Sequence, residues 1–306
     1  MSLVLVTPKI NPDLDGVACA YALVKILNAN DPGNKYLAGI FGEPQSEANF
    51  LLEKFQLKSG LVFDPVDHFD QFIIVDASDI IGMPQAIRAL DVVEVIDHRS
   101  VTQAKELFPQ AKIQIEAVGA AATLIVEKAQ ALEFSLDLGS LTLLFGAIYS
   151  NTLNLQPSIA TERDLAALRF CEEQSDGKLS PQLVAEMFNY KTKYLDDHLG
   201  EVMASDFKGF TGSLGIAQLE GFDLDDLVAT RLVEIKSILA RLQIENDTRR
   251  IFLNACDLNR GHSIFVAPGK DTELMLAKAL NVSFDTNGVA RNDRLILRKQ
   301  ILPLLE

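Results

Sequence analysis

Acidic residues stand at the ends of three short apolar runs in this sequence. The residues concerned are Asp13 and Asp15 after residues 3–6, Asp76 after residues 72–75, and Asp97, His98 and Arg99 after residues 92–96. If the runs are parallel strands of one sheet, their carboxyl ends meet at the edge where open α/β sheets bind ligands. Carboxylates that converge there repel one another unless a cation lies among them. Carboxylate oxygens with one imidazole suit Mn²⁺ or Mg²⁺, so the pattern predicts a site for a divalent metal ion.

Each of these acids also has an ordinary structural explanation when it is taken alone. Asp15 could cap a helix that begins at Gly16, and an aspartate at the end of a strand often caps a loop. His98 carries weight because the chain has only four histidines. The other three follow no acidic strand end and are interpreted as surface or structural residues: His68, His198 and His262. The convergence of several acids, rather than any one of them, indicates a site.

The elements that must position these residues alternate between strands and helices in the first half of the chain. Apolar and β-branched runs predict strands at residues 3–6, 36–40, 72–75, 92–96 and 113–115. Apolar residues spaced by three and four predict helices at residues 16–27, 46–55, 83–89, 119–132 and 140–149. This alternation predicts an α/β fold with a parallel sheet that is covered on both faces.

The second half of the chain follows a polar, turn-prone stretch at residues 174–178. Beyond it the pattern predicts helices at residues 193–204, 223–246 and 272–280 and strands at residues 214–219 and 250–254. A chain of 306 residues is about twice the usual size of a domain. We therefore expect two domains with a boundary near Asn189, one spanning residues 1–189 and the other residues 190–306.

Composition excludes several classes of function. The net charge of −14, from 28 basic and 42 acidic residues, disfavours general binding to nucleic acid or to a membrane surface. A small anionic ligand is not excluded, because a few cations in one cleft can reverse the field there. Cys19, Cys171 and Cys256 are too scattered for a disulfide framework or a zinc finger and are interpreted as core residues in a reducing compartment. The sequence has no signal segment and no membrane-spanning apolar stretch, so we expect a cytoplasmic location.

Several motifs, taken in their order, resemble those of the DHH phosphoesterase superfamily. The segment 11–15, Asp76 and the segment 97–99 are similar to its N-P-D-x-D, D and D-H-H motifs. Later stretches resemble signatures of its DHHA2 domain: residues 206–210, 216–220 and 298–303. Residues 118–123 and 150–153 fall where the family has comparable segments. The resemblance covers almost the whole chain and points to the branch of manganese-dependent (family II) inorganic pyrophosphatases and exopolyphosphatases.

This resemblance implies a Rossmann-like, metal-binding catalytic DHH domain and a smaller α/β DHHA2 domain that binds substrate, with the active site in the cleft between them. It implies two metal ions and a bridging water that acts as nucleophile on a phosphoanhydride. Asp76 would bridge the ions and Asp13 would hold the first ion. Asp15 and His98 would hold the second.

Four cations are implied as contacts of the anionic substrate, three of them on a second domain that closes over the cleft. These residues are Arg99, Lys208, Arg298 and Lys299. Taken without the resemblance, Arg298 and Lys299 would be interpreted as a solvated cationic pair near the C-terminus.

Three positions depart from the family pattern. Lys9 stands where the pyrophosphatases have a histidine for the first metal, and Asn151 stands where they have an aspartate for the second. Arg99 replaces the second histidine of D-H-H, which is a mild change because a guanidinium binds phosphate well.

The charges of these residues bear on the number of ions. Asp13, Asp15 and Asp76 with a protonated Lys9 carry a net charge of −2, which one divalent ion balances. An ammonium about 4 Å from a second dication would cost roughly 8 kcal/mol at an effective dielectric constant of about 20. The hypothesis is that Lys9 replaces the first ion and that only the site of Asp15, Asp76 and His98 fills. The alternative is that Lys9 turns to solvent and leaves a weak two-metal site that includes Asn151.

The leading functional prediction is a Mn²⁺-, Mg²⁺- or Co²⁺-dependent hydrolase of inorganic pyrophosphate or short polyphosphate, with activity reduced by Lys9 and Asn151. One alternative is a weak or inactive phosphate-ligand-binding protein, and a homodimer is compatible with either. A second is a DHH phosphodiesterase on short oligonucleotides or cyclic dinucleotides, whose G-G-G-H-type run finds a faint echo in residues 260–263. A nicotinamide-dependent enzyme is disfavoured, because residues 11–13 do not form a G-x-G-x-x-G turn.

Overall fold

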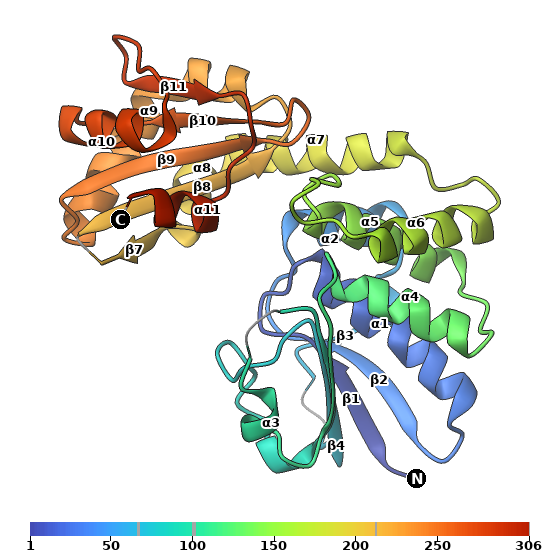
Figure 1. The fold of residues 1–306 in the computed structure, drawn as a ribbon. Helices are drawn as coiled ribbons and strands as arrows, with labels where there is room; N and C mark the ends of the chain where they lie inside the picture. The colour runs from blue at the N-terminus through green and yellow to red at the C-terminus, as the bar shows by residue number, and fades with distance from the viewer. Residues whose placement is uncertain (66–67, 100–101, 212, 306) are drawn as a thin grey trace. The chain divides into compact units, whose positions relative to one another are not determined.

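The computed structural model describes residues 1–65, 68–99, 102–211 and 213–305, which form two compact units (Figure 1). Unit 1 spans Met1–Met187 and unit 2 spans Phe188–Glu306. The division falls inside a single helix, α7 (Pro181–Asp197), which also contains Asn189. Within the described residues, no helix combines the length and apolar character needed to cross a membrane.

Unit 1 is built on a six-stranded sheet in which every strand pairs in parallel, in the order β3-β2-β1-β4-β5-β6. The strands are β1 (Leu3–Thr7), β2 (Lys35–Ile40), β3 (Val62–Phe63), β4 (Gln71–Val75), β5 (Val92–Asp97) and β6 (Lys112–Ile115). The order of the chain reverses between β1 and β4, and ligands of doubly wound sheets bind outside the carboxyl ends of the strands at such a point. The predicted parallel sheet is confirmed, and each strand predicted in the first half belongs to it.

Helices cover both faces of this sheet. The helices of unit 1 before α7 are α1 (Leu14–Asn30), α2 (Ser46–Lys54), α3 (Ala104–Leu107), α4 (Ala121–Ala131), α5 (Leu138–Asn151) and α6 (Glu162–Gln174). On one face α1 packs on β1, β2 and β4, and α4 packs on β5 (Figure 1). On the other face a buried cluster joins Leu5, Phe72 and Ile74 of the sheet to Ala104 of α3 and to Phe108. Burial on both faces explains why β1 and β4 are almost wholly apolar.

Some predicted helices are wrong. Residues 83–89 form turns that end in the short 3-10 helix Ala89–Asp91, with Gly82 at φ +76° and Pro84 at the start of the segment. Met83 and Ile87 still pack against the buried cluster. Their spacing therefore reflects side chains that face the core, although the backbone there is not helical. The helix predicted at residues 193–204 is two helices, the end of α7 and α8 (Leu199–Ser205), separated at His198.

Unit 2 contains a five-stranded mixed sheet in the order β11-β10-β9-β8-β7. The strands are β7 (Lys208–Phe210), β8 (Leu214–Gly221), β9 (Arg250–Asp257), β10 (His262–Val266) and β11 (Val289–Asn292). Strands β8 and β9 are connected by the long helix α9 (Leu224–Glu245) and pair with each other in parallel. The remaining pairs are antiparallel. The predicted strands 214–219 and 250–254 lie in β8 and β9, whereas the short strands β7, β10 and β11 were not predicted.

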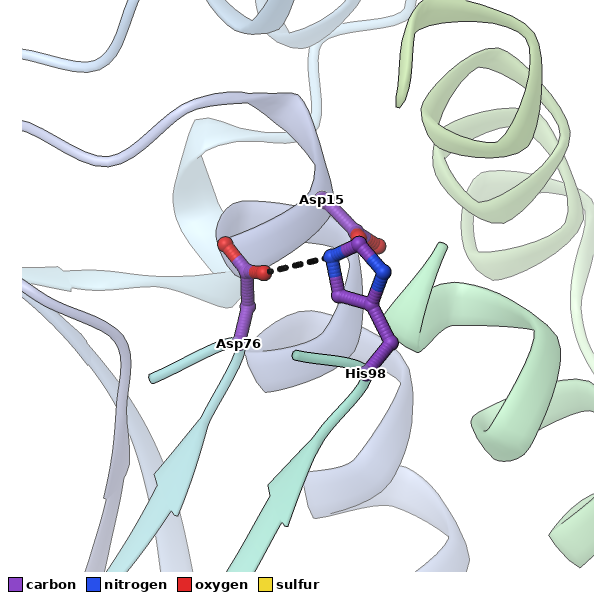
Figure 2. Close-up of side chains that lie close together, drawn as sticks. All are labelled: Asp15, Asp76 and His98. Carbon is purple, nitrogen blue, oxygen red and sulfur yellow. Dashed lines mark ion pairs between the residues drawn. The ribbon is translucent and has the colours of Figure 1, made fainter. Parts of the chain in front are cut away.

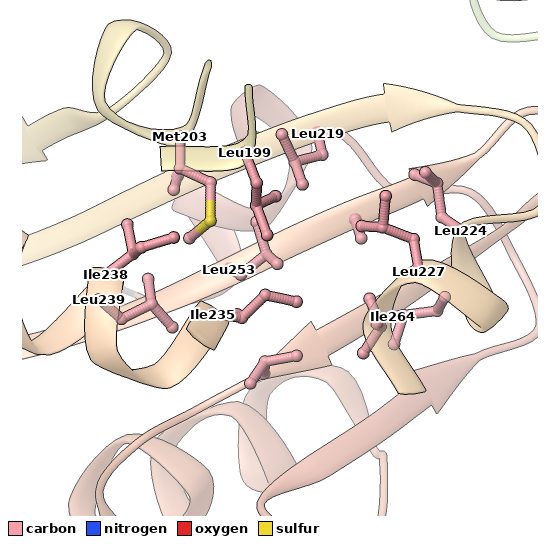
Figure 3. Close-up of a cluster of buried hydrophobic side chains, with 14 of the residues drawn as sticks. Leu199, Met203, Leu219, Leu224, Leu227, Ile235, Ile238, Leu239, Leu253 and Ile264 are labelled. Atoms are coloured by element: carbon pink, nitrogen blue, oxygen red, sulfur yellow. The ribbon is translucent and has the colours of Figure 1, made fainter. Parts of the chain in front are cut away.

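Two buried clusters pack on this sheet because successive side chains of a strand point to opposite faces. One cluster places Leu219 and Leu253 of the sheet against Ile235 and Leu239 of α9 (Figure 3). The other places Phe252 and Phe265 against α10 (Lys270–Leu280) and α11 (Arg298–Leu305). The free cysteines Cys19, Cys171 and Cys256 are buried, as the sequence predicted for core residues.

Candidate metal centre

The carboxyl ends of β1, β4 and β5 bring Asp15, Asp76 and His98 together, and we call these three residues the acidic centre. Asp15 lies in the first turn of α1, while Asp76 and His98 directly follow β4 and β5. One ligand atom of each lies within 4.8 Å of those of the others. His98 Nε2 is 3.6 Å from Asp76 Oδ1 and 3.9 Å from Asp15 Oδ2, and the side chains face one another in Figure 2. The strand ends thus place two carboxylates and one imidazole around a common point.

Asp15 is held by the beginning of helix α4. Its carboxylate accepts hydrogen bonds from the backbone N–H groups of Ala121, at 2.7 Å, and Ala122, at 2.8 Å. The N-terminus of a helix favours an anion through these groups and through its dipole. Burial nevertheless raises the pKa of Asp15 to about 6, against the lowering effects of His98 and of these N–H groups. Asp15 is therefore a rigidly oriented carboxylate in a site that lacks enough positive charge.

Asp76 carries the clearest sign of an incomplete site. Its φ of +53° lies in the left-handed region, which is strained for a residue with a side chain, and its N–H donates to Ile96 O at 2.8 Å. Its Oδ2 is buried and accepts no hydrogen bond from the described residues. Burial and the neighbouring charges of Asp13 and Asp15 raise the pKa of Asp76 well above its usual value. A buried carboxylate oxygen without a donor, beside other acids, fits a cation.

His98 presents one ring nitrogen to this point. Its Nδ1 lies 3.1 Å from Val118 O and donates a hydrogen bond to that carbonyl, so Nε2 faces the two acids. Burial alone would lower the pKa of His98, but its interactions with Asp76 and Asp15 outweigh burial and raise the pKa to about 9. The imidazole is therefore oriented so that Nε2 could ligate a metal ion, and such an ion would have to displace the proton on Nε2.

Asp13 and Lys9 form a separate ion pair at the edge of the acidic centre. Lys9 Nζ donates to Asp13 Oδ2 at 3.2 Å, and Asp13 Oδ1 accepts from Gly16 N at 3.2 Å. Asp13, rather than Asp15, is thus the N-cap of α1, which begins at Leu14. Burial would raise the pKa of Asp13, but Lys9 and the Gly16 N–H hold it below its usual value. Burial would lower the pKa of Lys9, but Asp13 and Asp76 raise it.

Asn151, the last residue of α5, also reaches the acidic centre. Its Nδ2 donates to Asp15 Oδ2 at 2.6 Å and lies 3.2 Å from His98 Nε2. The amide therefore supplies a hydrogen-bond donor and no negative charge at this position.

The other predicted cations are paired to different degrees. Arg99 donates from Nη1 to Asp79 Oδ2 at 2.8 Å, and its Nε lies 3.6 Å from Asp97 Oδ2. Asp97 in turn accepts from the backbone N–H of His98 at 2.8 Å and so orders this turn.

In unit 2, Arg298 is only 9% exposed and donates to the carboxylate of Asp206 and to the carbonyl groups of Asp206 and Ile216. Lys208 and Lys299 are exposed, and within the described part of the chain no ion pair involves either of them. Arg298 is thus a buried residue that joins α11 to β8, and it does not form a solvated pair with Lys299.

Sequence reasoning missed the groups that orient the acidic centre. These are the carbonyl of Val118, the N–H groups of Ala121 and Ala122, and the buried carboxylate of Asp164. Asp164 accepts from Gly119 N at 2.8 Å and from Thr123 Oγ1 at 2.6 Å, and a Cβ on Gly119 would lie 2.5 Å from Thr152 Cγ2. The Val118–Thr123 segment was recognisable in the sequence as a family segment, but nothing there shows that it holds Asp15 and His98.

A second group of acids with a histidine lies in unit 2 and contains its own cations. Asp225 pairs with Arg260, Arg291 and His262, whose Nε2 lies 2.8 Å from Asp225 Oδ2. Asp257 accepts backbone hydrogen bonds from Leu224, Asn259 and Arg260. The Arg260–Ser263 segment, the faint echo of a G-G-G-H run, is thus part of an ion-pair network around the turn between β9 and β10, and His262 lies within this network.

Comparisons with known proteins find a family model for the first part of the chain and similar proteins over its whole length. Residues 3–148 match the model of the DHH family, N-terminal domain. The manganese-dependent inorganic pyrophosphatase of Bacillus subtilis (strain 168) is 25% identical over 311 residues, which cover 100% of this chain and 98% of that protein. A Methanococcus jannaschii structure assigned to the family II inorganic pyrophosphatases matches with a TM-score of 0.69 at 22% identity, over 99% of this chain and 98% of that chain.

A weaker structural match is an exopolyphosphatase-related protein from Bacteroides fragilis. Its TM-score is 0.52 at 9% identity, over 99% of this chain and 90% of that chain. The resemblance drawn from the motifs is confirmed: residues 3–148 are a DHH family N-terminal domain, and the whole chain has the fold of the family II inorganic pyrophosphatases.

Proposed function

We propose that this protein is a metal-dependent hydrolase of phosphoanhydrides, acting on inorganic pyrophosphate or short polyphosphate. The observation that carries the proposal is the acidic centre, in which Asp76 directs Oδ1 toward the imidazole of His98, which Val118 orients. The other oxygen of Asp76, Oδ2, is buried and has no hydrogen-bond donor among the described residues. Full-length similarity to a protein named as a manganese-dependent inorganic pyrophosphatase supports this substrate class.

The residues present fit a divalent ion. Two carboxylates and one imidazole form a donor set suited to Mn²⁺, Mg²⁺ or Co²⁺, and their negative charge lies where such an ion would relieve it. When bound, the ion supplies Lewis-acid polarisation of a phosphoryl oxygen and a nucleophilic water at neutral pH. In the net reaction one water is consumed and a P–O bond of the P–O–P link breaks. Pyrophosphate gives two phosphates, and a longer chain gives one phosphate and a chain shorter by one unit.

Cations of the chain would bind the substrate. Lys9 and Arg99 lie beside the acidic centre and would stabilise charge on phosphoryl oxygens. We assign Lys208 and Lys299 to the same role because they are exposed cations, whereas the guanidinium of Arg298 is buried and held by Asp206. The division of labour proposed is catalysis by residues 1–189 and substrate binding by residues 190–306.

A second candidate is a phosphate-binding protein with little or no turnover. It is favoured by Asn151, whose amide donates a hydrogen bond to Asp15. A carboxylate at this position would be an additional ligand and would strengthen metal binding. The same feature predicts reduced activity if the protein is an enzyme.

A phosphate-release assay separates the two candidates. With Mn²⁺, Mg²⁺ or Co²⁺ we expect phosphate from pyrophosphate or tripolyphosphate, and EDTA should abolish the release. Calorimetric binding of pyrophosphate without release would support the phosphate-binding protein instead. Cleavage of short oligonucleotides with no action on either polyphosphate would contradict both.

The affinity for Mn²⁺ is expected to rise with pH between about 6 and 9. The pKa of Asp15 is raised to about 6 and that of His98 to about 9, so protons occupy ligand atoms at the low end of this range. Each proton that the ion displaces makes the affinity increase about tenfold per pH unit below the pKa. Calorimetric titrations with Mn²⁺ at several pH values measure this slope, and an affinity independent of pH would contradict the assignment of these ligands.

A further inference from the structure

We propose that the acidic centre holds a single divalent ion and that the ammonium of Lys9 occupies, on Asp13, the position of a second. The inference rests on the proposed metal-dependent function and adds to it the number of ions and the role of Lys9.

The first argument is the spacing of the ligand atoms in the acidic centre. Around an ion with ligands at about 2.1 Å, neighbouring ligand atoms are about 3 Å apart and opposite ones about 4 Å apart. In the acidic centre His98 Nε2 lies 3.6 Å from Asp76 Oδ1 and 3.9 Å from Asp15 Oδ2. These three residues can therefore close on one ion with shifts smaller than the width of an atom.

The second argument is that both oxygens of Asp13 are already engaged. Oδ2 accepts from Lys9 Nζ at 3.2 Å, and Oδ1 caps helix α1 through Gly16 N. The side chains of Lys9 and Asp13 are 30% and 27% exposed, so the pair is partly shielded from solvent. An ion bound by Asp13 would have to displace the Lys9 ammonium from Oδ2 and would then lie close to the positive charge of that ammonium.

The third argument is charge. The carboxylates of Asp13, Asp15 and Asp76 and the ammonium of Lys9 have a net charge of −2, which one divalent ion neutralises. Asn151 adds no charge, because its amide donates to Asp15 Oδ2 at 2.6 Å. A second divalent ion would leave this largely buried group of residues with a net positive charge.

The test counts metal ions rather than turnover. Protein purified with Mn²⁺ and freed of loose metal by gel filtration is analysed by mass spectrometry of the metal and by electron paramagnetic resonance. We expect one Mn²⁺ per chain and the resolved hyperfine pattern of an isolated ion. Two ions per chain, about 3.5–4 Å apart, would couple and lose that pattern. That result would overturn the inference and leave the proposed function standing, whereas no bound Mn²⁺ would overturn both.

A double variant tests the role of Lys9 directly. Lys9→His with Asn151→Asp replaces the ammonium by a neutral ligand and adds a carboxylate, so the net charge becomes −4 and we expect two ions. If this variant folds, as judged by circular dichroism, and still binds one ion, Lys9 is not the residue that limits the centre to one ion, and the inference fails. Lys54→Met, which removes the surface pair with Glu186, is the matched control and should keep one ion. If the double variant does not fold, the ion count of the unaltered protein still decides.

Discussion

Replacing Asp76 with asparagine is expected to lower metal-dependent phosphate release by about 10³-fold or more. The change preserves shape but removes the carboxylate whose Oδ2 is buried beside two other acids and has no donor among the residues that the structure describes. Because that charge is unfavourable in the absence of a cation, the metal-free variant should be at least as stable as the unaltered protein. Mn²⁺ should no longer raise its melting temperature, since binding is what stabilises the native state.

The control for this experiment is Asp91→Asn. Asp91 immediately precedes β5, at the amino end of the strand that carries His98 at its carboxyl end, and pairs with Arg88 on the surface. We expect this variant to keep both phosphate release and stabilisation by Mn²⁺. An Asp76→Asn protein that behaves like Asp91→Asn in both assays would show that the acidic centre is not the metal site.

The largest effect on stability is expected from Asp164→Ala. The carboxylate of Asp164 is fully buried and accepts four hydrogen bonds, from Gly119 N, Thr123 Oγ1, Thr161 N and Thr161 Oγ1, at 2.6–2.8 Å. Alanine would leave these donors buried without an acceptor and remove the capping box of α6. We expect the free energy of unfolding to fall by about 3–5 kcal/mol, measured by urea denaturation.

The same variant should weaken metal binding, because Asp164 anchors Gly119 in the Val118–Thr123 segment, which holds Asp15. The matched control is Glu162→Ala, an exposed acid in the same first turn of α6, which should cost at most about 1 kcal/mol through the helix dipole. Equal midpoints of denaturation for the two variants would contradict the role assigned to Asp164.

Much of the fold of unit 1 is predictable because its central strands are mostly apolar runs. The runs at β1, β4 and β5 are buried on both faces, and such runs are easily told from helices by their length and flanking polar residues. The residues between β4 and β5 show the limit of this reasoning. Met83 and Ile87 have helical spacing, but they lie in turns and pack against the core from there. Local periodicity reports which side chains are buried and does not specify the backbone that buries them.

The orienting contacts of the site lie beyond any local pattern. Asp15 is bonded to residues 106 and 107 positions away, and Asn151 approaches it from 136 positions away. The burial of Arg298 against Asp206 likewise joins residues 92 positions apart. These residues are brought together by the packing of whole helices and strands, so no motif within one segment can reveal the contacts between them.

The sequence by itself determined that acids and a histidine stand at the carboxyl ends of apolar strands, because alternating strands and helices make the strands parallel and parallel strands have their carboxyl ends at one edge. Only the tertiary structure decided how each acid is used. Asp13 caps α1 and pairs with Lys9, whereas Asp15 and Asp76 turn toward His98. The difference arises because hydrogen-bond donors from α1 and α4 and the ammonium of Lys9 satisfy some carboxylate oxygens and leave Asp76 Oδ2 without a partner in the described chain.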